Sequence, residues 1–288
     1  MTLEITPIGA ALGAVVSGLD LSQKLAAETV ERLRNAWLEH IVLVYHGQDL
    51  SDPQLLDFTR YFGELEYPPS KLLNYSQGSG QKDDIPLEIN VISNVIENGK
   101  KIGQLGNAEA KWHTDTPFVE RPPAASILHA WELPPCGGNT CFMNMYAVLE
   151  ALPAELLAKI EGKKCKHDVS HTSDGVLRHD YDDSPDAKSC PGPWHPMIRT
   201  HPDSGRKALY LGKRAWAYIE GTTTEENEEI LDAIWAIAER PEFVYEHVWT
   251  QGDVLMWDNR CAMHRRDEFD GSQRRIMHRS QLRGDIPV

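Results

Sequence analysis

The chain has little positive charge. It carries 29 Lys and Arg residues against 43 Asp and Glu residues, which gives a formal net charge of −14 at pH 7. Nucleic acids and anionic membrane surfaces are bound through basic faces, so this balance argues against both kinds of partner. An anionic small molecule is still compatible with the sequence, because a few inward-pointing cations reverse the electrostatic potential locally.

Long apolar runs and metal-type cysteine spacings are also missing. No apolar run approaches the roughly 18 residues of a membrane-spanning helix, and the first ten residues lack the basic and apolar regions of a secretory signal. Only two cysteines lie near each other, and no second pair follows to complete a zinc site. We therefore expect a cytoplasmic protein with reduced, mostly buried thiols: Cys136, Cys141, Cys165, Cys190 and Cys261.

The remaining composition, 41% hydrophobic and 25% charged, is that of an ordinary globular protein. Helical spacing of apolar residues predicts helices over 25–40, 51–63, 152–160 and 222–240. Short apolar or β-branched runs predict strands at 41–45, 88–95, 125–133, 207–212 and 253–258. Many short strands with a few helices indicate a mainly β fold, a double-stranded β-helix (a cupin-like jelly roll) with helical decoration, as one domain over 1–288.

Two segments stand apart from this pattern. Residues 71–85 follow a pair of prolines and are rich in Gly, Ser and Gln, which favours a long loop acting as an active-site lid. Residues 167–190 are crowded with His and Asp. His167 and His171 would form part of a second metal site if they shared a helix face. The segment lacks helical apolar spacing and the glycine of a calcium loop, so we expect a solvated, mobile insertion.

The stretch KWHTDTPF places His113 and Asp115 two residues apart, so both side chains share one face if it is extended. Two histidines and one carboxylate on one face of a metal suit ferrous iron. The second histidine should come from another strand, and we choose His264, which follows the predicted strand at 253–258. Farther on, Arg275 and Arg279 are four residues apart and share a face of an extended segment.

Together with Thr140 after a Gly-Gly turn, these residues resemble the iron(II)/2-oxoglutarate dioxygenases, and specifically the taurine and phenoxyacetate-herbicide dioxygenase group. The resemblance runs nearly from end to end. The stretches that carry it are LGAVVSGLDLS (12–22), HGQDLSDPQLLDFTRYFGELE (46–66), WHTDTPF (112–118), PPAASILHAWELPPCGGNT (122–140), VWTQGDVLMWDNRCAMHR (248–265) and RRIMHR (274–279).

The resemblance implies that His113, Asp115 and His264 bind Fe(II), and that 2-oxoglutarate and dioxygen occupy the open positions. It also implies that Arg275 holds the far carboxylate of 2-oxoglutarate, aided by the hydroxyl of Thr140. The planar fork of arginine suits a carboxylate better than lysine does. The alternatives are a surface salt bridge for Arg275 and a simple turn hydroxyl for Thr140.

For the substrate, the resemblance implies that Arg279 binds an anionic group near the iron, the alternative being an ion pair with one of the many carboxylates. Lys71 and Lys100 look more like the phenoxyacetate branch than the taurine branch, although both can be solvated surface residues. These cations favour an organic acid over taurine, so the expected substrate is a small anionic organic acid such as an aryloxyalkanoate or sulfonate. Asp115 retains the carboxylate that halogenating relatives replace, which favours hydroxylation, with C–O or C–S cleavage when the new hydroxyl lands beside the heteroatom.

Competing functions stay open at this point. The same scaffold serves as a binding protein if the iron site is vestigial, or as a metal-dependent hydrolase or isomerase that uses no oxygen, which leaves Arg275 without a role. Within the family, desaturation or epimerisation in natural-product biosynthesis is a further possibility. The resemblance also implies a homo-oligomer, a dimer or tetramer.

Overall fold

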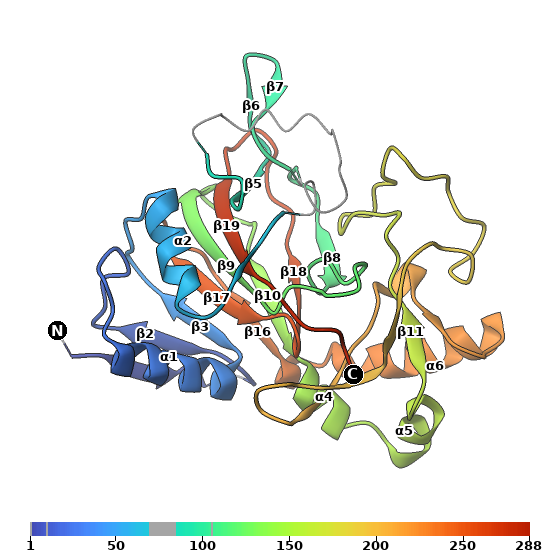
Figure 1. Ribbon diagram of the computed structural model, residues 1–288. Coiled ribbons are helices and arrows are strands. Elements are labelled where there is room, and N and C mark those ends of the chain that lie inside the picture. The colour runs from blue at the N-terminus through green and yellow to red at the C-terminus, as the bar shows by residue number, and fades with distance from the viewer. Residues whose placement is uncertain (1, 10, 69–84, 105) are drawn as a thin grey trace.

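The computed structural model describes residues 2–9, 11–68, 85–104 and 106–288. Its centre is a pair of packed β-sheets (Figure 1). The larger sheet has the order β1 (Glu4–Pro7), β2 (Ala14–Ser17), β3 (Val42–Tyr45), β17 (Val254–Asp258), β9 (Ala125–Glu132), β19 (Ile276–Leu282) and β4 (Leu65–Glu66), with β5 (Asn90–Ser93) also paired to β19. The smaller sheet has the order β16 (Val244–His247), β10 (Thr140–Asn144), β18 (Ala262–Arg266) and β8 (Ala110–His113).

Helices cover the outer face of the larger sheet and one end of the molecule. In Figure 1, α1 (Ala27–His40) and α2 (Asp52–Arg60) lie against the larger sheet, and α4 (Met145–Glu150), α5 (Ala154–Ile160) and α6 (Thr224–Ala238) gather at the other end. The short elements near them are β11 (Lys164–Lys166), β12 (Trp194–Pro196), β13 (Ile198–Thr200), β14 (Lys207–Leu209), η1 (Arg214–Trp216), β15 (Tyr218–Ile219) and η2 (Pro241–Phe243). A hairpin of β6 (Ile96–Glu97) and β7 (Lys100–Lys101) completes the described elements.

The larger sheet is buried on both faces. Leu255 and Trp257 of β17 join the core between the sheets, whereas Val254 and Met256 join a second core beneath α1 and α2. A strand covered on both sides needs apolar residues at every position, which explains the uninterrupted runs VLVY and VLMW. The mainly β jelly roll with helical decoration is therefore confirmed.

Two helix boundaries differ in detail from the sequence-based expectation. The helix expected over 51–63 has Ser51 as its N-cap, and the backbone N–H of Ser51 donates to Gln54 Oε1 over 2.9 Å. The helix expected over 222–240 begins at Thr224, because Thr223 is its N-cap and forms a reciprocal capping box with Glu226. The α-helical part of α2 ends at Arg60, before Gly63, since the following residues make only three-residue turns.

The segment 167–190 is not solvated throughout. His167, Asp168, Ser170 and His171 are buried, which corrects the expected exposure for this first part. Asp168 accepts hydrogen bonds from the backbone N–H groups of Ser170 and His171, so a tight turn satisfies its charge inside the protein. The mobility of the segment stays a prediction. The lid expected at 71–85 lies outside the described residues except for its last position.

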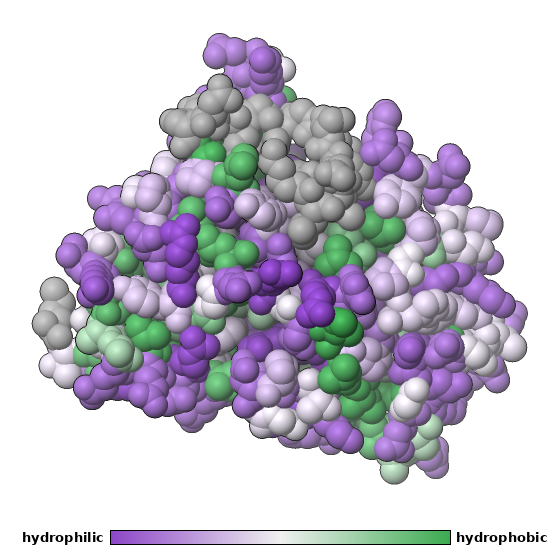
Figure 2. Space-filling model, viewed as in Figure 1, coloured by the Kyte–Doolittle hydropathy of each residue, from purple (hydrophilic) through white to green (hydrophobic). Residues whose placement is uncertain are grey.

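The surface agrees with the composition. Polar residues cover most of the face in Figure 2, and hydrophobic residues appear on it as separate small groups. Four of the five cysteines are buried, as expected, and Cys136 is exposed. Across the described part of the chain, no helix is both long and apolar enough to cross a lipid bilayer.

Candidate active site

Strand pairing brings three distant side chains together. His264 of β18 is the direct partner of His113 at the end of β8, and Asp115 follows two residues later. Asp115 Oδ1 lies 4.0 Å from Nε2 of His113 and 3.8 Å from Nε2 of His264. The ligand atoms of the three buried residues all lie within 4.8 Å of one another. The sequence-based trio is thus one cluster in space.

Both imidazoles are in the form that binds a metal. Nδ1 of His113 is 2.7 Å from the carbonyl oxygen of Lys111, which only accepts, so Nδ1 carries the proton and Nε2 keeps a free lone pair. Burial lowers the pKa of His113. Burial, reinforced by His113, lowers the pKa of His264 to about 3. Both rings are therefore neutral at neutral pH.

The carboxylate of Asp115 is held at both oxygens. Ser126 Oγ donates to Oδ2 and Arg279 Nη1 donates to Oδ1, each over 2.6 Å. Burial alone raises the pKa of this carboxyl, but the positive charge of Arg279, with the hydrogen bond from Ser126, brings it down to about 2. Two neutral imidazoles and one ionised carboxylate are the donor set that Fe(II) takes in non-haem oxygenases, so these residues fit the metal.

A second feature is the buried guanidinium of Arg275, which approaches a Gly-Gly turn. Nη2 of Arg275 donates to the carbonyl of Gly138 over 3.3 Å, and its buried Nε has no partner among the described residues. Burial, with the nearby charge of Arg266, lowers the pKa of Arg275 to about 9, so the guanidinium remains charged at neutral pH. A buried cation with an unused donor requires an anionic partner.

Thr140, on β10, also has a donor that an anion can use, namely its hydroxyl proton. Its Oγ1 accepts a hydrogen bond from Trp249 Nε1 over 2.9 Å, which leaves the hydroxyl proton to donate elsewhere. Gly138 has φ +68°, and a Cβ there would lie 3.1 Å from Arg275 Nε. The glycine therefore supplies both the left-handed turn and the space for the guanidinium.

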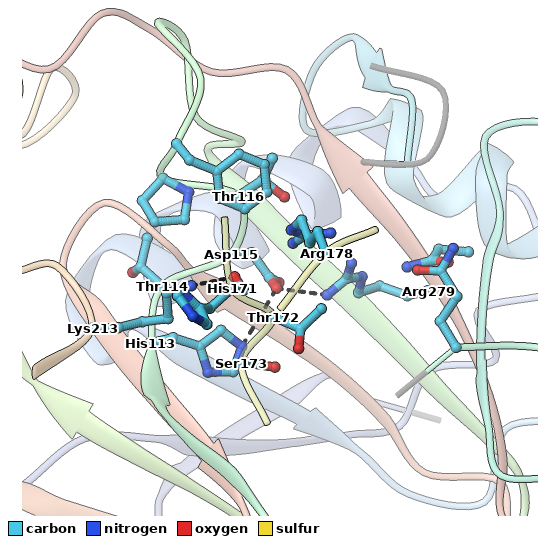
Figure 3. Close-up of a pocket in the computed structure, with 14 residues that line it drawn as sticks. His113, Thr114, Asp115, Thr116, His171, Thr172, Ser173, Arg178, Lys213 and Arg279 are labelled. Atoms are coloured by element: carbon cyan, nitrogen blue, oxygen red, sulfur yellow. Dashed lines mark hydrogen bonds and ion pairs between the residues drawn. The ribbon is translucent and has the colours of Figure 1, made fainter. Parts of the chain in front are cut away.

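A pocket opens in front of His113 and Asp115 (Figure 3). Among the residues that the structure describes, its charged lining residues are Asp115, Lys213, Arg178 and Arg279, so there cations outnumber anions in a protein whose net charge is −14. Such a pocket attracts small anions. The other residues around this cavity of about 70 Å³ are Asn90, Gln104, His113, Thr114, Thr116, Pro117, Phe118, His171, Thr172 and Ser173.

The structure places the predicted substrate cations differently from one another. Arg279 lines the pocket and is also ion-paired with Asp115, so both of its sequence-based interpretations have support. Lys100 is exposed on the β6–β7 hairpin and is not among the residues that line the pocket. Lys71 lies outside the described residues. Sequence reasoning missed Ser126, Arg178 and Lys213, because their neighbours are remote in the chain.

A further group of His201, Asp258 and Cys261 has metal-like spacing but is a closed hydrogen-bond network. The backbone N–H groups of Asp203 and Ser204 both donate to His201 Nδ1. The proton of this ring is therefore on Nε2, which donates to Asp258 over 2.9 Å. With both nitrogens engaged, His201 has no lone pair for a metal.

Comparison with known proteins agrees with this geometry. The family model "Taurine catabolism dioxygenase TauD, TfdA family" matches residues 4–281. An alpha-ketoglutarate-dependent 2,4-dichlorophenoxyacetate dioxygenase from Cupriavidus pinatubonensis is 34% identical, with 100% of both chains covered. Pentalenolactone F synthase from Streptomyces avermitilis is 35% identical over 99% of this chain and 96% of its own length.

The fold agrees as well. A solved structure of AAD-2 in complex with Mn(II) and N-oxalylglycine has a TM-score of 0.80 and 33% identity, and the match covers 100% of this chain and 99% of that one. The chain is thus a 2-oxoglutarate-dependent non-haem iron dioxygenase, and it belongs to the taurine catabolism dioxygenase TauD, TfdA family.

Proposed function

We propose that this enzyme hydroxylates a small anionic organic acid, with His113, Asp115 and His264 binding Fe(II). The observation that carries the proposal is the buried trio, with two lone pairs and one carboxylate oxygen facing one another beside a cation-lined pocket. Bound iron, with 2-oxoglutarate and dioxygen, supplies the oxidising power, and succinate and carbon dioxide are the co-products.

The chain's own residues contribute binding and orientation. Arg275 and Thr140 bind the far carboxylate of 2-oxoglutarate, since the guanidinium is buried with an unused donor and the hydroxyl proton of Thr140 is free. Arg279 orients the substrate's anionic group, and the sequence-based roles of Lys71 and Lys100 in substrate binding stay predictions. When the new hydroxyl is on a carbon next to an ether oxygen or a sulfur, the product collapses and the C–O or C–S bond breaks.

The similarity to a 2,4-dichlorophenoxyacetate dioxygenase supports an aryloxyalkanoate or related acid as the substrate. The similarity to pentalenolactone F synthase supports a second candidate, namely hydroxylation, desaturation or epimerisation in natural-product biosynthesis. We further propose that the enzyme is cytoplasmic, that it needs no nucleic acid or membrane, and that it forms a dimer or tetramer.

The test is release of succinate from 2-oxoglutarate under air with Fe(II), across a panel of aryloxy acids and sulfonates. Replacing Arg275→Lys removes the planar fork and should raise the KM for 2-oxoglutarate by about tenfold or more. The neighbouring Arg274→Lys is the matched control, because Arg274 is exposed and ion-paired with Glu132. Equal effects of the two variants, or no succinate with any acid, would contradict the proposal.

A further inference from the structure

Lys213 is a buried cation of the pocket that the reaction described above does not use. It precedes η1, its side chain is only 6% exposed, and it lines the pocket together with Arg279 and Arg178. It contacts two acceptors, the carbonyl oxygen of His171 and Asp168 Oδ2, the latter at 3.4 Å. A lysine ammonium has three N–H donors, so one of them has no acceptor among the described residues.

Asp168 orients the Lys213 ammonium but does not accept from all of its N–H groups. The carboxylate accepts from the backbone N–H groups of Ser170 and His171, both within 3.0 Å, and also from the Ser170 hydroxyl. Its ion pair with Lys213 is longer than these bonds. Burial lowers the pKa of Lys213 to about 8, although Asp168 acts in the opposite direction. The ammonium of Lys213 is therefore able to bind a further anion.

The wall that carries Lys213 is fixed in place. The His171 ring stacks on Trp216 with centroids 4.2 Å apart and an interplanar angle of 12°. The Lys213 ammonium lies 5.3 Å from the centre of the same Trp216 ring. A lysine held between an aromatic ring, a carbonyl and a carboxylate loses little further side-chain entropy when it binds a ligand.

Lys213 and Arg279 act on different sides of the metal-binding residues. Arg279 bonds to Asp115, whereas Lys213 contacts Asp168 and the carbonyl oxygen of His171. Figure 3 shows Asp115 between the two cations. Arg279 also has an unused donor, because its buried Nε has no partner among the described residues. Arg279 and Lys213 thus line the same pocket from different parts of the chain, β19 and the residue before η1.

We infer that the substrate is a small acid with two anionic groups, one bound by Arg279 and the other by Lys213. This inference rests on the proposed function and narrows its substrate class from organic acids in general to diacids. Such a substrate gives Arg279 and Lys213 one further anionic partner each, beyond Asp115 and Asp168, whereas a monoacid does so for only one of the two cations.

The test compares matched acids on the complex of the enzyme with Mn(II) and N-oxalylglycine, where no turnover occurs. The pairs are phenoxyacetate with 4-carboxyphenoxyacetate, and hexanoate with adipate. We expect at least one diacid to bind about tenfold or more tightly than its monoacid partner, as measured by calorimetry. No diacid binding more tightly than its partner would overturn the inference.

Variants assign the preference to Lys213. Lys213→Met should remove the diacid advantage, so that each diacid binds no more tightly than its monoacid partner. The double variant Asp168→Asn/Lys213→Met removes the buried ion pair as a whole, so it keeps the test valid if the single variant unfolds. Lys207→Met, at an exposed lysine of β14, is the matched control. A diacid advantage that survives in the double variant contradicts the role of Lys213.

The two proposals fail in different ways. If the protein binds neither Mn(II) nor N-oxalylglycine, the proposed function is wrong. If it binds both and prefers monoacids, only the diacid inference is wrong.

Discussion

At the scale of single residues, Ser126 determines how the Asp115 carboxylate faces the metal site. A hydroxyl has one donor and two acceptor positions. Asn259 Nδ2 and Gln281 Nε2 donate to Ser126 Oγ over 3.0 and 2.9 Å, so both acceptor positions are filled. Trp257 Nε1, which can only donate, contacts Asn259 Oδ1 and thereby fixes that amide. The Ser126 proton can then only point to Asp115 Oδ2, so Oδ1, which also accepts from Arg279, is the oxygen that faces the two histidines.

Replacing Ser126→Ala should therefore weaken metal binding roughly tenfold, because residues that orient metal ligands contribute about 10- to 100-fold to affinity. A Co(II) or Mn(II) titration of the purified protein measures the change without turnover. Ser280→Ala is the control, since Ser280 is also a buried serine of the larger sheet but bonds to Thr59 on the outer side. The same loss of affinity in both variants would show a general packing effect instead.

At the scale of elements, β19 shows how much of the site the sequence predicts. Its alternation directs Met277 and Arg279 to the space between the sheets and Ile276 and His278 to the helices, as the spacing of the arginines predicted. Strand alternation is a local property, so one sequence suffices to infer it. The pairing of Ser126 with Asp115 and the position of Lys213 depend on long-range packing, which spacing along the chain does not encode.

The Gly-Gly turn before β10 gives a prediction at this scale. Gly138→Ala should raise the KM for 2-oxoglutarate, because the added Cβ meets Arg275 Nε at 3.1 Å and displaces the guanidinium. It should also cost about 1 kcal/mol of stability from the positive φ. Gly162→Ala has a similar φ of +70° with no atom within 4 Å, so it reproduces the strain without the contact. An equal KM in the two variants would refute this role of Gly138.

At the scale of the whole molecule, several buried histidines make folding sensitive to acid. Burial lowers the pKa of His113, His129, His167, His195 and His264. A histidine with a depressed pKa in the folded state binds its proton first in the unfolded state, at an ordinary pKa of about 6.5. The free energy of unfolding should therefore decrease as pH falls below about 6.5, before most carboxylates titrate.

His167 tests this expectation away from the metal site. Neither ring nitrogen has a hydrogen-bond partner in the described part of the chain, and the ring centre lies 5.0 Å from those of His195 and Tyr210. In the metal-free protein, His167→Phe should reduce the loss of stability between pH 6.5 and 5 by up to about 1.4 kcal/mol per pH unit. Urea unfolding at several pH values measures the slope. His179→Phe, at an exposed ring, should leave it unchanged.

Some features of the whole molecule could be predicted from the sequence and others could not. The jelly roll follows from many short strands and few helices, and the acidic surface follows from composition alone. The cationic pocket inside an acidic protein does not, because Arg178, Lys213 and Arg279 come from separate parts of the chain and meet only after folding. The net charge of the whole chain does not reveal a local excess of positive charge.

Strands and loops contribute different residues to the site, and this difference affects how such an enzyme diverges in evolution. A single-residue insertion in β19 would turn Arg279 to the opposite face of the sheet, where Ile276 and His278 now lie, so selection should remove it. Lys213 and Arg178 lie outside the paired strands, where changes of length leave the sheet register intact. Enzymes that descend from one ancestor can therefore change the substrates that they bind while they keep the same oxidation reaction.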